Sequence, residues 1–165
     1  RSVGVPFDPA ALPAHAELRL SRGPAELAPG VLFLGEIPRT NPLEAPPVGE
    51  TLRGGTWEPD RLLDDTALAL ATKSGLFLLT GCSHAGICNM LQYALSLTGE
   101  TRVAGVLGGL HLFESGPQLD FVLARLAQLG AKTLYPCHCT SLAVKHALCG
   151  AFDVHEVGVG LTLAL

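Results

Sequence analysis

The sequence has no excess of basic residues, no long hydrophobic run and little charge of either sign. Its 165 residues include 11 Lys and Arg against 15 Asp and Glu, for a net charge of −4. Because nucleic-acid binding depends on Lys and Arg that neutralise phosphates, we expect no nucleic-acid partner. No apolar run approaches the roughly 20 residues of a membrane helix and no signal peptide is visible, so we expect no membrane partner. Charged residues make up 16% and apolar residues 48%, which excludes a disordered chain and allows one domain with a core.

The chain also lacks the even set of cysteines that is typical of a disulfide framework. The chain has five cysteines, an odd number, and Cys137 and Cys139 lie only two positions apart. This spacing fits a disulfide framework poorly and favours a reducing, cytoplasmic setting.

The chain has two segments that differ in their proline content. Ten of the 12 prolines lie within residues 1–60. Because proline resists helices and interrupts sheet ladders, we expect this segment to be loop-rich with a few short strands, the clearest at 30–35. Residues 61–165 alternate apolar runs with helical periodicity, which predicts an α/β arrangement of order β-β-α-β-α-β-α-β. The predicted strands are 66–72, 76–80, 101–107, 133–135 and a last one near 154–165, and the predicted helices are 86–97, 115–129 and 141–148.

Three histidines follow predicted strands at equal spacing. His84, His111 and His138 are each separated by 27 residues, one βα unit apart. Since the carboxyl ends of parallel strands meet at one edge of a sheet, we expect the three imidazoles to converge there. Imidazole binds zinc, iron and related divalent ions, so this edge is a candidate metal site. Ser83 and Thr140 are candidates to orient ligands.

Other residues near these histidines have more than one interpretation. Asp64 and Asp65 precede a strand, and Asp65 is a candidate ligand or general base, although a plain turn explains the pair equally well. The helix beginning near Ala85 would offer its free N–H groups as an anion site. Cys82 or Cys137 could be ligands, but buried packing is the ordinary role of a free cysteine. Alternating side chains of an extended chain point in opposite directions, which argues against residues 137–139 as one ligand set.

The remaining histidines have simpler interpretations. We interpret His15 as an ordinary surface residue, and we expect His146, inside a predicted helix, and His155, in the predicted last strand, to have structural roles. A thiol redox protein that uses Cys137 and Cys139 is a weaker alternative, because one residue separates them instead of the usual two.

Several segments of the chain resemble motifs of the metallo-β-lactamase superfamily, especially its dihydropteroate-synthase-like branch, which includes an enzyme of methanopterin synthesis. The segments are 64–68 (DDTAL), 79–89 (LTGCSHAGICN), 107–112 (LGGLHL) and 135–140 (YPCHCT), together with 35–39 (GEIPR) and Glu44. The resemblance implies that residues 1–165 form a single partial domain of an αββα sandwich, a loop-rich segment followed by its C-terminal β-α-β-α-β half.

The resemblance also implies a function. It implies a metal-dependent hydrolase that uses metal-bound hydroxide as nucleophile and holds one or two divalent ions, zinc first and iron or manganese as alternatives. His84 and His138 match metal-ligating histidines of the family. His111 falls near a bridging aspartate of many relatives, so it is a candidate ligand or substrate contact, and Asp65 and His111 are the candidate catalytic residues. The substrate would be a small molecule, pterin-like or phosphorylated.

One departure from the family is an absence. The superfamily's main His-x-His-x-Asp-His motif does not occur in these 165 residues. We therefore expect this chain to be the C-terminal part of a longer or truncated protein, active only with an upstream segment, or prone to self-association. The alternative is a degenerate, non-catalytic domain that binds a metal or a partner.

Overall fold

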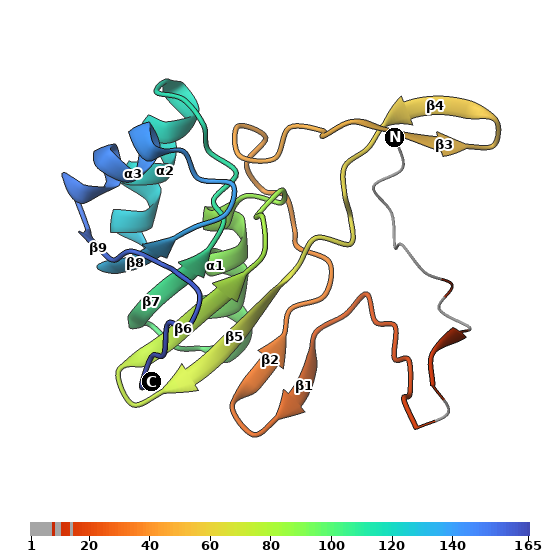
Figure 1. The fold of residues 1–165 in the computed structure, drawn as a ribbon, viewed down its shortest axis with the longest axis horizontal. Helices are drawn as coiled ribbons and strands as arrows, with labels where there is room; N and C mark the ends of the chain where they lie inside the picture. The colour runs from red at the N-terminus through yellow and green to blue at the C-terminus, as the bar shows by residue number, and fades with distance from the viewer. Residues whose placement is uncertain (1–7, 9–10, 14) are drawn as a thin grey trace.

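A computed structural model describes residues 8, 11–13 and 15–165, and shows a sheet with helices packed on it (Figure 1). The seven-stranded sheet has the order β1-β2-β5-β6-β7-β8-β9. Its strands are β1 (Ala25–Ala28), β2 (Val31–Phe33), β5 (Ala67–Thr72), β6 (Gly75–Thr80), β7 (Val103–Gly108), β8 (Thr133–Pro136) and β9 (Asp153–Val154). A separate hairpin, β3 (Glu50–Arg53) with β4 (Thr56–Pro59), projects away from this body (Figure 1).

Three helices connect the strands from β6 onward. They are α1 (Ile87–Thr98), α2 (Pro117–Gln128) and α3 (Leu142–Cys149). Strands β6 to β9 pair in parallel and in chain order, so right-handed crossovers place all three helices on one face of the sheet. Among the described residues, no helix is long and apolar enough to span a membrane.

Local signals explain where these helices begin and end. Helix α1 ends at Gly99, whose left-handed conformation (φ 69°) suits a C-cap. Helix α2 begins with Pro117, whose missing N–H costs nothing in the first turn. The Ser141 side chain accepts a hydrogen bond from the Val144 N–H and caps α3. The structure thus confirms the three predicted helices and the β-β-α-β-α-β-α-β order.

The core lies between the helices and one face of the sheet. Its fully buried residues include Leu76 and Leu78 of β6, Val106 of β7 and Leu134 of β8. Opposite them lie apolar residues of the helices, Ile87, Met90, Leu91, Ala94, Leu119, Val122, Leu126, Val144 and Leu148.

One feature of the sheet differs from the sequence-based expectation. The last strand covers only residues 153–154, and the prediction of a strand near 154–165 is wrong. After β9 the chain turns onto the open face of the sheet, the face opposite the helices, where His155 stacks on Tyr135 with ring centroids 4.9 Å apart. His155 is therefore not in a strand. In the proline-rich segment, the strand predicted at 30–35 is confirmed as β2, which pairs with β1 and, antiparallel, with β5 and so extends the main sheet.

Candidate metal centre

The candidate site lies where β6, β7 and β8 end side by side. Ser83, His111 and His138 follow these strands and have positive φ angles of 55°, 50° and 50°. Non-glycine residues rarely adopt this left-handed conformation, and it concentrates at functional sites, where the surrounding structure compensates for its cost. Each of the three strand-end turns thus contains a strained residue at the edge where the sequence predicted a site.

His84 and His111 lie against each other at this edge. Their ring centroids are 4.5 Å apart, and His84 Nδ1 lies 3.6 Å from Asp65 Oδ1. The other Asp65 oxygen accepts a hydrogen bond of 2.7 Å from the Ala85 N–H. His111 Nδ1 is buried with no hydrogen-bond partner among the described residues. A buried nitrogen without a partner is costly, so its lone pair or proton requires a ligand, and a metal ion fits that requirement.

Burial shifts the pKa values of His111 and Asp65 in opposite directions. Burial, and next the neighbouring His84, lower the pKa of His111, while Asp65 opposes this shift. Burial raises the pKa of Asp65, against the Ala85 N–H and His84, which lower it. His138 is among the groups that lower the pKa of His111, which places all three histidines within electrostatic reach. A neutral imidazole is the form that ligates a metal.

Sulfur and imidazole donors gather beside this pair. The donor atoms of Cys82, His138 and Cys139 all lie within 4.8 Å of one another. The left-handed conformation of His138 breaks the alternation of an extended chain, so His138 and Cys139 reach the same place. The alternation expected of an extended chain therefore does not hold at this turn. Cys137, named as a candidate ligand, is not in this group.

Buried hydroxyl groups hold the three turns together. The Ser83 hydroxyl donates to the Gly109 carbonyl at 2.7 Å, and the Thr140 hydroxyl accepts from the Leu110 N–H at 3.0 Å. Ser83 and Thr140, expected to orient ligands, instead link the backbones that carry the histidines. This bracing makes the edge rigid.

The expected anion site at the start of α1 is occupied by the protein itself. Glu44, which is 4% exposed, accepts hydrogen bonds from the Cys88 and Asn89 N–H groups at 2.9 and 3.2 Å. These are the second and third helical residues, whose N–H groups lack partners within a helix. A carboxylate there also favours the positive end of the helix dipole. The prediction of a free anion site is therefore wrong.

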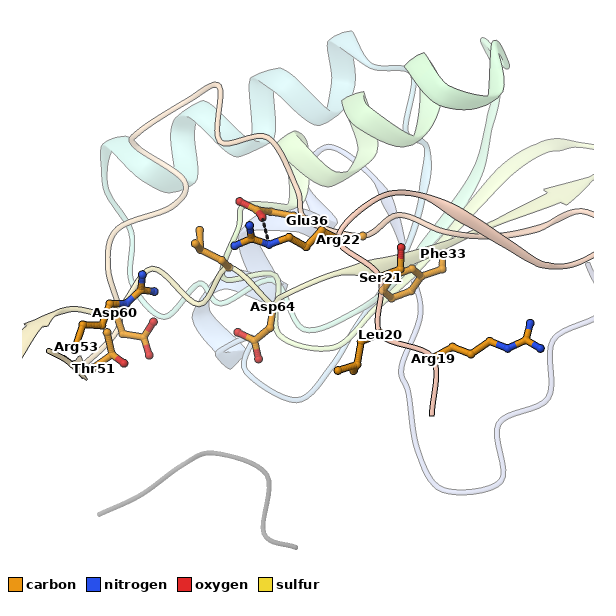
Figure 2. A pocket seen from close by; sticks show the side chains of 12 residues that line it. Arg19, Leu20, Ser21, Arg22, Phe33, Glu36, Thr51, Arg53, Asp60 and Asp64 are labelled. Atoms are coloured by element: carbon orange, nitrogen blue, oxygen red, sulfur yellow. Dashed lines mark ion pairs between the residues drawn. The ribbon is translucent and has the colours of Figure 1, made fainter. Parts of the chain in front are cut away.

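A cavity of about 530 Å³ lies against the loop that leads to Asp65, and none of the three histidines lines it. The loop at 60–64, the segment before β1, the end of β2 with the residues after it, and the β3–β4 hairpin all contribute to its lining (Figure 2). Its charged lining residues are Arg19, Arg22, Glu36, Arg53, Asp60 and Asp64. Each arginine is paired with a glutamate, for example Arg22 with Glu36 at 3.6 Å, so Asp60 and Asp64 add negative charge that these pairs do not balance.

Glu36 pairs with Arg22 and not with the nearby Arg39. Arg39 instead donates to the Arg61 and Leu62 carbonyls at 2.6 and 2.8 Å, and so holds the loop that leads to Asp65.

The chain is similar in sequence to two curated proteins of one organism. No family model matches the sequence. The chain is 33% identical over 132 residues to a 7,8-dihydropterin-6-methyl-4-(beta-D-ribofuranosyl)-aminobenzene-5'-phosphate synthase of Methanocaldococcus jannaschii, covering 77% of this chain and 45% of the relative. It is 30% identical over 128 residues to an uncharacterized protein of the same organism, covering 76% of this chain and 46% of that protein. The chain thus spans about half the length of the curated relatives it matches.

A solved structure has the same fold. It is described as a metal-dependent hydrolase of the beta-lactamase superfamily, with a TM-score of 0.78 and 28% identity over 90% of this chain and 58% of that one. Three observations agree with this structural similarity. They are the sheet with its three helices, the sequence similarity and the motifs around His84, His111 and His138. The chain therefore has the fold of this metal-dependent hydrolase of the beta-lactamase superfamily.

Proposed function

We propose that the chain is part of a metal-dependent hydrolase and supplies several groups of its metal centre. The observation that carries this proposal is the cluster of His84, His111 and Asp65 at one strand edge, with His111 Nδ1 buried and without a partner among the described residues. The identity of the solved relative as a metal-dependent hydrolase supports it.

The residues of the cluster have different proposed roles. His84 and His111 are ligands, with His138 beside them, for zinc or, alternatively, iron or manganese. Asp65 faces His84 Nδ1, so it orients the ring and leaves Nε2 to face the ion. A divalent ion bound there would activate water for attack on a substrate. The buried carboxyl of Asp65 is also the group placed to exchange a proton near that ion.

The site needs further groups, because a catalytic zinc has about three protein ligands and a two-metal site needs more. We propose that another segment of the same protein, with the superfamily's His-x-His-x-Asp-His motif, or a second copy of this chain, completes it. The share of the relatives that this chain spans, 45% and 46%, supports this.

The substrate we propose is a small pterin-like or phosphorylated molecule, on the printed activity of the first relative. The five free cysteines support a reducing, cytoplasmic location.

Metal content tests the proposal. We expect His84→Ala to lower zinc affinity by about 10-fold or more, since even residues that only orient a ligand contribute that much. His146→Ala, an exposed histidine of α3, is the matched control and keeps the metal. Zinc binding would be followed by titration of the purified chain with a chromophoric chelator as competitor. Equal affinity in both variants contradicts the assignment.

A further inference from the structure

We infer that Cys82, His138 and Cys139 form a thiolate-containing metal site at this edge, beside the histidine and carboxylate cluster of His84, His111 and Asp65. The inference deepens the proposed function, because His138 is shared between them. It assigns two sulfur donors to the chain and therefore a preference for softer ions such as zinc over magnesium or calcium.

The geometry brings the two cysteines together from distant turns. The Cys139 thiol donates to the Cys82 carbonyl at 3.4 Å across 57 residues of sequence. All three donor atoms lie within 4.8 Å of one another. Two sulfur atoms bound to a tetrahedral zinc ion at about 2.3 Å each lie about 3.8 Å apart. Side-chain rotations that move the donor atoms by about 1 Å would therefore bring them to binding distance.

The backbone is shaped around the Cys139 sulfur. A Cβ atom on Gly109 would lie 2.5 Å from Cys139 Sγ and 2.7 Å from the Gly81 carbonyl oxygen. Because glycine has no Cβ, the turn after β7 can pass this close to the Cys139 sulfur. The sulfur is therefore held at the edge by close packing from one side and by the Cys82 carbonyl from the other.

A metal ion held by these sulfur atoms would take the place of the thiol protons, because a coordinating thiol loses its proton. Binding forms two metal–sulfur bonds and releases one proton from each thiol to solvent.

Cobalt(II) is the probe, because sulfur-to-cobalt charge transfer absorbs in the near ultraviolet and ligand-field bands in the visible report the ion itself. We expect the purified chain to show both. Cys82→Ser and Cys139→Ser should lose most of the charge-transfer absorption and weaken cobalt affinity by about 10-fold or more. Cys137→Ser, on the other side of His138, is the matched control and keeps both signals.

The outcomes separate this inference from the proposed function. Visible bands without charge transfer, or charge transfer unchanged in Cys82→Ser and Cys139→Ser, overturn the thiolate site and leave the histidine centre intact. Absence of both signals contradicts both proposals. Loss of two free thiols in the purified chain, which indicates a disulfide, also overturns the inference. Circular dichroism of the variants shows that each remains folded.

Discussion

At the scale of single residues, side chains from distant positions complete what the local sequence leaves open. Helix α1 begins after Gly86, which has no side chain to cap the helix. Glu44, 44 residues upstream of Cys88, supplies the cap. The Asn89 side chain accepts a hydrogen bond from the Thr40 hydroxyl at 2.8 Å, and so the loop that carries Glu44 is tied to the same turn. The loop and the helix that follows His84 thus stabilise each other.

The buried Glu44 carboxyl predicts a pH dependence. Burial raises its pKa above the usual 4.5, against the Cys88 and Asn89 N–H groups and the Arg125 charge, which lower it. The folded chain therefore binds this proton more tightly than the unfolded chain. The contribution to stability is full below the ordinary pKa and is lost as pH rises through the raised value.

Replacing the Glu44 carboxyl tests the direction of this pH dependence. We expect the free energy of unfolding of Glu44→Gln to fall less than that of the wild type as pH rises from about 4 to about 7. Urea denaturation at several pH values measures it. Glu114→Gln, at an exposed acid, is the control and should follow the wild type. A Glu44→Gln curve parallel to the wild type would refute the prediction.

At the scale of elements, the parallel run from β6 to β9 places the site. Each strand ends at the same edge, and each crossover helix covers the same face, so the three turns with His84, His111 and His138 stack side by side. The antiparallel β5–β6 hairpin fixes the start of this run. Its register pairs Thr72 with Gly75, and Asp65 lies just before β5 at the same edge as His84.

The β5–β6 turn makes a stability prediction. Gly75 has a φ of 126°, and a Cβ there would lie 2.5 Å from the Arg102 carbonyl oxygen. This oxygen accepts a hydrogen bond from the Leu76 N–H. We expect Gly75→Ala to lower the free energy of unfolding by about 2–3 kcal/mol, because both the backbone conformation and the contact are unfavourable. Gly158→Ala, with open space and no positive φ, is the control. Equal denaturation midpoints for the two variants would disprove this account.

At the scale of the whole molecule, one face of the sheet is apolar, and no helix of the described residues covers it. Residues that pair in register share this face, including Leu68 with Leu79 and Leu79 with Leu107. They are only partly buried, in contrast to the helix-covered face. A sheet with an open apolar face needs a second layer, which in a sandwich is another sheet.

This open face predicts association of the isolated chain. We expect sedimentation velocity to show self-association that increases with protein concentration, because association covers apolar surface. Leu70→Glu, on the open face beside Phe77, should weaken it, and Leu97→Glu, at an exposed position of α1, should not. A monomer at all concentrations, with cooperative unfolding, would argue against this prediction.

The sequence by itself determined the order of elements and the position of the histidines along it. Apolar periodicity and capping residues such as Gly99 and Pro117 are local signals, so the helices and the β5–β6 hairpin could be predicted. Because βα units repeat, the convergence of His84, His111 and His138 on one edge could also be predicted.

Only the tertiary structure decided which distant groups meet. The pairing of Cys82 with Cys139, the cap that Glu44 places on α1 and the path of the tail after β9 depend on contacts between segments far apart in sequence. The left-handed turn at His138, which brings its ring beside Cys139, has only a weak signal in the sequence, because histidine adopts this conformation more often than most residues but still rarely. These features have a local cost in free energy that favourable packing of the whole fold offsets. Local sequence patterns therefore do not predict them.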